Sequence, residues 1–148
     1  MKKFTAISLA AAMTACVLSG CSGKKVSYKD GTYEAQSSVY ENDDGTDDGN
    51  GYGVVSVTIT DGKISDCTFT TYEKDGTLKD EEYGKEGGRI ANKDYYNKAQ
   101  RAVQASQNYA DQLTAKGNLD DVDAISGATI SYDEFTEAVE LALKQAEN

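Results

Sequence analysis

A hairpin over residues 52–72 limits this chain to folds that contain an antiparallel sheet. From residue 54 to residue 60, apolar and hydroxyl-bearing side chains largely alternate, which is typical of a strand with one buried face. Asp61-Gly62 follows, a pair typical of two-residue hairpin turns whose residues adopt positive φ. Residues 63–72 return as the partner strand, and their apolar positions change parity, which predicts either a β-bulge near residues 65 and 66 or a strand buried on both faces.

Two amphipathic helices are predicted after the hairpin. An apolar stripe at helical spacing covers residues 96–113, and Gly117 is typical of the residue that ends a helix. A second helix is predicted to begin at Ser131, with Glu134 three residues later completing a capping box. With a weak strand over residues 32–40, the pattern predicts an α+β domain in which two or more helices pack on a small antiparallel sheet.

The N-terminal segment has the features of a secretion signal. Two lysines precede an apolar, uncharged run over residues 4–18, and the run ends in Leu-Ser-Gly before Cys21. This ending resembles the bacterial lipobox, which implies cleavage before Cys21 and lipidation there. The alternative is a plain secretory signal with a chance cysteine. We therefore expect a lipoprotein signal peptide at 1–20, a lipidated cysteine with a tether at 21–31, and one domain at 32–148.

Charge and composition exclude several classes of function. The whole chain has a formal charge of −10, and removal of the signal with its two lysines makes it −12, which disfavours binding to nucleic acid. The chain contains no histidine, so neither zinc sites with imidazole ligands nor histidine-dependent catalysis is expected. Cys67 is left without a partner for an internal disulfide, and we interpret it as a small buried residue rather than a reactive thiol. The acidic loop at 41–51 does not have the spacing of an EF-hand calcium loop, so no metal site is predicted.

The segment with the most chemical information is residues 121–131, between the two predicted helices. It brings hydroxyl groups and Gly127 next to a helix start, where unpaired N–H groups favour a phosphate. Glycine allows a ligand to approach the backbone closely. The alternative is that the serine and threonine residues here are caps and nothing more.

Residues 123–129 read Asp-Ala-Ile-Ser-Gly-Ala-Thr, which resembles the flavinylation motif of the FMN-binding domain family. That family includes a flavinylated component of sodium-translocating NADH:quinone oxidoreductase and many bacterial lipoproteins. The resemblance extends to the start of the domain at 30–33, to the hairpin and to the last helix. It implies that a separate flavin transferase attaches FMN to Thr129 through a phosphoester. The other residues that it implies in cofactor binding are Asp123, Ser126, Gly127, Ala128 and Ser131.

The resemblance and the signal together predict an extracytoplasmic lipoprotein that carries covalent FMN for electron transfer. Its expected location is the outer face of the cytoplasmic membrane or the cell surface, held by the lipid anchor. Its expected partners are the flavin transferase and a membrane redox donor such as a dehydrogenase or quinol. The chain shows no nucleophile–base pair, so an electron carrier is expected rather than a substrate-specific enzyme. Tyr33, Tyr72 and Tyr132 are candidates to stack on the flavin ring.

Three alternatives remain open. The domain could be a flavin-dependent reductase of a small substrate. It could be a non-redox surface binding module of the same fold. It could also hold FMN without a covalent bond.

Overall fold

The computed structural model describes residues 26–147. The predicted signal peptide, the predicted lipidation site Cys21 and the first part of the predicted tether lie outside the described residues. The elements are β1 (Gly31–Gln36), β2 (Tyr52–Thr60), β3 (Lys63–Tyr72), α1 (Lys93–Lys116), the short 3-10 helix η1 (Leu119–Asp121) and α2 (Thr129–Ala146). Within this part of the chain, no helix combines the length and the hydrophobicity needed to cross a membrane.

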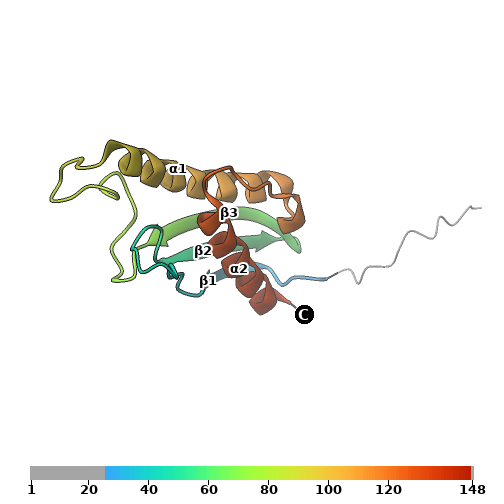
Figure 1. Ribbon diagram of the computed structural model, residues 1–148. Coiled ribbons are helices and arrows are strands. Elements are labelled where there is room, and N and C mark those ends of the chain that lie inside the picture. The colour runs from blue at the N-terminus through green and yellow to red at the C-terminus, as the bar shows by residue number, and fades with distance from the viewer. Residues whose placement is uncertain (1–25, 148) are drawn as a thin grey trace, which may run out of the picture.

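The strands form an antiparallel sheet in the order β1-β2-β3, and both helices pack on one face of it (Figure 1). α1 lies against β3, while α2 crosses β2 and β1. The buried face of the sheet carries Val55, Val57 and Ile59, which form one apolar core with residues of both helices. This arrangement confirms the predicted α+β fold.

The turn of the hairpin forms as predicted. Asp61 and Gly62 have φ values of 53° and 70°, the positive values that a two-residue turn of this kind requires. The carboxylate of Asp30 accepts hydrogen bonds from the N–H groups of both turn residues, at 3.0 and 2.9 Å. The start of the domain is thereby attached to the tip of the hairpin.

The predicted bulge is present in β3. The register shifts between Thr58 and Ile59, and Ser65 is the extra residue on the opposite strand. The shift places both Ile64 and Cys67 on the buried face. Burial raises the pKa of the Cys67 thiol to about 12, which agrees with a buried residue rather than a reactive thiol.

β1 ends at Gln36 rather than at Tyr40, so the first predicted strand is shorter than expected. The N–H of Gly53 donates to the hydroxyl of Ser37 at 3.0 Å. In a regular β-ladder a backbone carbonyl would accept this bond, so the regular pairing of β1 with β2 stops here. The predicted acidic loop follows, and backbone hydrogen bonds of 2.7 and 3.1 Å between Tyr40 and Gly51 close its base.

The predicted capping box of α2 is wrong. The helix begins at Thr129, its N-cap is Ala128, and no side chain in the described part of the protein caps it. Ser131 lies inside the first turn and is buried, and Glu134 is packed in the interior instead of reaching back to the helix start. Tertiary packing explains the difference, because the buried hydroxyl of Tyr109 holds the carbonyl of Ala128 and fixes the helix start there.

Candidate functional site

A buried tyrosine of α1 positions the glycine turn before α2. The hydroxyl of Tyr109 donates to the carbonyl of Ala128 at 3.2 Å and accepts the N–H of Ile125 at 3.0 Å. These two bonds lie on either side of Gly127, whose φ is 81°. A Cβ at Gly127 would have nothing within 4 Å, so glycine is required there by the backbone conformation and not by lack of space.

Two further α1 side chains hold the acidic end of the motif. The amide of Gln112 accepts the N–H of Asp123 at 2.9 Å and donates to its carbonyl at 3.3 Å. Lys116 forms an ion pair of 2.8 Å with the Asp123 carboxylate, which is otherwise exposed to solvent. The motif is therefore attached to α1 at both ends, which gives its backbone a defined conformation.

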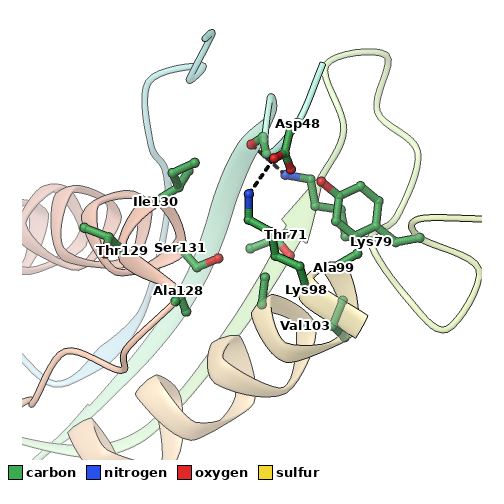
Figure 2. Close-up of a pocket in the computed structure, with 14 residues that line it drawn as sticks. Asp48, Thr71, Lys79, Lys98, Ala99, Val103, Ala128, Thr129, Ile130 and Ser131 are labelled. Atoms are coloured by element: carbon green, nitrogen blue, oxygen red, sulfur yellow. Dashed lines mark hydrogen bonds and ion pairs between the residues drawn. The ribbon is translucent and has the colours of Figure 1, made fainter. Parts of the chain in front are cut away.

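A cavity of about 250 Å³ lies beside the first turn of α2 (Figure 2). Residues 127–131 form one side of it, and Thr129 is exposed at the start of the helix. α1 contributes small apolar side chains to a second side, namely Ala99, Ala102 and Val103. The remaining wall is more polar and includes Thr71, Lys79 and Tyr83.

The structure brings four of the predicted cofactor-binding residues to this cavity: Gly127, Ala128, Thr129 and Ser131. Asp123 and Ser126 do not line it, and both are exposed in the loop that leads to it. Because α2 has no side-chain cap among the described residues, its first N–H groups remain available to a ligand at this end of the helix.

A nearly buried ammonium group gives the cavity its charge. Lys79 is 8% exposed, and its Nζ donates to the carbonyl of Gly49 at 3.1 Å (Figure 2). The same nitrogen lies 5.1 Å from the ring centroid of Tyr83. Burial lowers the pKa of this ammonium, while the negative charges of Glu134, Glu73 and Asp48 act in the opposite direction.

The acidic loop forms part of the wall. Asp48 makes an ion pair of 2.5 Å with Lys98 of α1, at the mouth of the cavity (Figure 2). The next residue, Gly49, packs so closely on Ile130 that an added Cβ would come within 2.7 Å of its Cδ1 atom. The loop thus joins α1 and α2 across the cavity.

The three tyrosines predicted to stack on a flavin ring do not line this cavity. Tyr33 lies on β1, Tyr72 stacks against Tyr52 with ring centroids 5.4 Å apart, and Tyr132 packs against the core. The aromatic residue of the cavity is Tyr83, in the irregular segment between β3 and α1.

Sequence reasoning missed three residues of this site. Tyr109 is not part of the apolar stripe predicted for α1. The next residue, Ala110, belongs to that stripe and was the only local indication that Tyr109 is buried. Lys79 follows a turn and has no pattern that marks it as buried. Glu134 fitted a capping box, which concealed its burial.

The donor set fits a phosphorylated aromatic cofactor. A helix start offers N–H groups to a phosphate, the apolar side chains of α1 provide a surface for a ring, and Lys79 supplies a positive charge. Over residues 26–147, the structure holds no group of three or more His, Cys, Asp or Glu side chains placed to bind a metal ion.

A comparison with protein families points to the same kind of ligand. The sequence model of the FMN-binding domain matches residues 50–144. No curated protein matches the chain. The crystal structure of the CPE2226 protein from Clostridium perfringens is 24% identical, with a TM-score of 0.56, over 80% of this chain and 88% of that one. A solution NMR structure of a protein from Clostridium thermocellum is 25% identical, with a TM-score of 0.42, over 79% of this chain and 91% of that one.

The first of these structures shares the fold. The domain match covers more than half of the sequence and includes the hairpin, both helices and the motif. The chain therefore belongs to the FMN-binding domain family, and it is a flavin-binding module whose cofactor is FMN.

Proposed function

We propose that this protein is a lipid-anchored electron carrier that works outside the cytoplasmic membrane with FMN esterified to Thr129. The observation that carries the proposal is the place of Thr129. It is exposed, it is the first residue of α2, and it borders a cavity with a cationic wall. A phosphoester there would lie at a helix N-terminus, where the helix dipole and free N–H groups favour a phosphate.

Accessibility supports Thr129 as the acceptor. A transferase has to reach the hydroxyl, and Thr129 is exposed whereas Ser131, in the same first turn of α2, is buried. The attachment of the motif to α1 through Tyr109 would present the acceptor in one conformation. Ser126 and Asp123 are exposed in the same loop, where a transferase could recognise them.

FMN supplies one- and two-electron transfer when it is bound. The residues of this chain would bind and orient it. The small apolar side chains of α1 and the ring of Tyr83 would contact the flavin, and Lys79 would supply a positive charge in the same cavity. The negative charge of the domain opposes the addition of electrons to the flavin. Because Lys79 is positively charged, it partly offsets that effect.

The anchor explains why a covalent bond is useful. A cofactor held outside the membrane by non-covalent contacts alone is lost when it dissociates, whereas an ester to Thr129 retains it. Lipidation at Cys21 and the tether after it would keep the domain near a membrane donor such as a dehydrogenase or quinol. The flavin transferase is the partner that the ester requires.

The decisive experiment is intact mass spectrometry of the protein secreted with and without a co-expressed flavin transferase. The wild type should gain the mass of one FMN less water, and Thr129→Ala should gain nothing. Thr68→Ala is the matched control, because Thr68 is an exposed threonine on the open face of the sheet. No gain in the wild type, with the transferase active on another substrate protein, would refute the covalent carrier.

A second measurement separates the carrier from its alternatives. Membrane preparations should reduce and reoxidise the loaded protein, while the isolated domain should not turn over small electron acceptors in steady state. Sustained turnover would favour a flavin-dependent reductase. Failure to acquire flavin under any condition would favour a binding module without redox chemistry.

A further inference from the structure

One turn of α2 beyond Ser131, which lines the cavity, lies a buried carboxylate that the binding of FMN does not explain. Glu134 is 3% exposed, and neither of its carboxylate oxygens has a hydrogen-bond partner among the described residues. It packs against Gly53 of β2, where an added Cβ would come within 3.3 Å of the Glu134 Cβ atom. A buried carboxylate without partners destabilises the fold, so its presence calls for a functional reason.

Lys79, which lines the cavity (Figure 2), lies close to this carboxylate: an added Cβ at Gly51 would come within 2.9 Å of the Lys79 Nζ, and Gly53, two residues later, is the residue that packs on Glu134. The positive charge of Lys79 lowers the pKa of Glu134, but burial outweighs it and raises that pKa to about 7. Lys79 makes its hydrogen bond to Gly49, not to the carboxylate. An ammonium has three donors, so Lys79 can also interact with a ligand in the cavity.

The other charges around the pair come from several elements. Asp133, on the same helix as Glu134, raises the pKa of Glu134. Glu73, just after β3, and Asp48, in the acidic loop, act on Lys79. Gly53 of β2 packs on the Cβ atom of Glu134, Phe69 of β3 packs on Gly53, and neither residue titrates. The α1 lysine at the mouth of the cavity is paired with Asp48.

We propose that Lys79 and Glu134 form a proton-coupling pair. When negative charge enters the cavity, the Lys79 ammonium interacts with that charge and stabilises the ionised form of Glu134 less, so Glu134 takes up a proton. The inference rests on the proposed function, because the electron that FMN receives supplies the charge. An external reductant provides that electron, and the solvent provides one proton. One O–H bond forms on the Glu134 carboxylate, no bond in the protein breaks, and both changes reverse on reoxidation.

Redox-difference infrared spectroscopy of the FMN-loaded protein tests this pair. Reduction by dithionite at pH 8 should produce the C=O band of a protonated carboxylic acid in the wild type. Glu134→Gln should lack the band, and Glu140→Gln, an exposed carboxylate on the same helix, should keep it. In protein shown by its mass to carry FMN, a missing wild-type band would overturn the inference, as would a band that persists in Glu134→Gln.

The midpoint potential gives a readout of a different kind. It should depend more steeply on pH in the wild type than in Glu134→Gln between pH 7 and pH 9. Equal slopes in the two loaded proteins would contradict proton uptake at Glu134.

A measurement on the unloaded protein distinguishes failure of this inference from failure of the proposed function. The titration of Glu134 can be followed by NMR of its labelled side-chain carboxyl carbon. Lys79→Met should raise the titration midpoint, while Lys98→Met, which removes a lysine at the cavity mouth, should leave it nearly unchanged. An unchanged midpoint in Lys79→Met overturns the pair. Absence of FMN loading together with a shifted midpoint contradicts the proposed carrier and supports the coupling of the two residues.

Discussion

Replacement of Glu134 by glutamine should stabilise the unloaded domain, and it should do so much more at alkaline than at acidic pH. Folding raises the pKa of this carboxyl from 4.5 to about 7. One pKa unit corresponds to about 1.4 kcal/mol, so ionised Glu134 lowers the free energy of unfolding by about 3 kcal/mol above pH 8. Because the folded state binds the proton more tightly, this loss of stability is absent well below pH 4.5 and grows as the pH rises to about 7.

Urea denaturation of wild type and Glu134→Gln at pH 5 and pH 8.5 measures this effect. Glutamine has nearly the shape of the protonated acid, so the expected gain is below about 1 kcal/mol at pH 5 and about 3 kcal/mol at pH 8.5. Glu140→Gln is the control, because Glu140 is exposed on the same helix and should change the stability little at either pH. An equal gain at both pH values, or a loss at pH 8.5, would refute the reasoning.

Three other perturbations test the packing and the motif. Tyr109→Phe removes both hydrogen bonds to the motif, so it should cost about 1–3 kcal/mol of stability in urea denaturation. It should also lower the fraction of protein that gains FMN, and unchanged loading would contradict the positioning role of Tyr109. Gly53→Ala places a Cβ within 2.3 Å of the Phe69 ring, and the expected loss of about 1–3 kcal/mol would be refuted by wild-type stability. In protein that lacks residues 1–21, Cys67 is the remaining thiol and should react with a disulfide reagent at pH 8 only after unfolding, because burial raises its pKa to about 12; rapid reaction of the folded protein would show that it is accessible.

The features predicted correctly from the sequence are those that local chemistry determines. Asp61-Gly62 forms its turn because both residues tolerate positive φ, and Gly117 ends α1 with a φ of 68° for the same reason. The bulge could be predicted because the apolar residues of β3 change parity. Side chains alternate between the two faces of a strand, so an extra residue is needed to keep the apolar ones on the buried face.

The features that the sequence did not reveal depend on contacts between distant segments. Ser131 and Glu134 have the spacing of a capping box, but packing against the sheet and against α1 determines where α2 begins. Lys79 becomes a cavity residue because the acidic loop, thirty residues earlier, folds over it. Local spacing carries no information about such contacts.

The bonds from Tyr109 have a consequence for protein engineering. If Thr129 accepts FMN as proposed, residues 123–129 are short enough to be considered as a portable flavinylation tag. In this domain, however, their backbone is held by side chains of a different helix, so a transplanted heptapeptide would leave its supports behind. A segment transferred with this conformation has to include α1 and the sheet on which both helices pack, so the smallest unit that preserves it is the domain rather than a linear peptide.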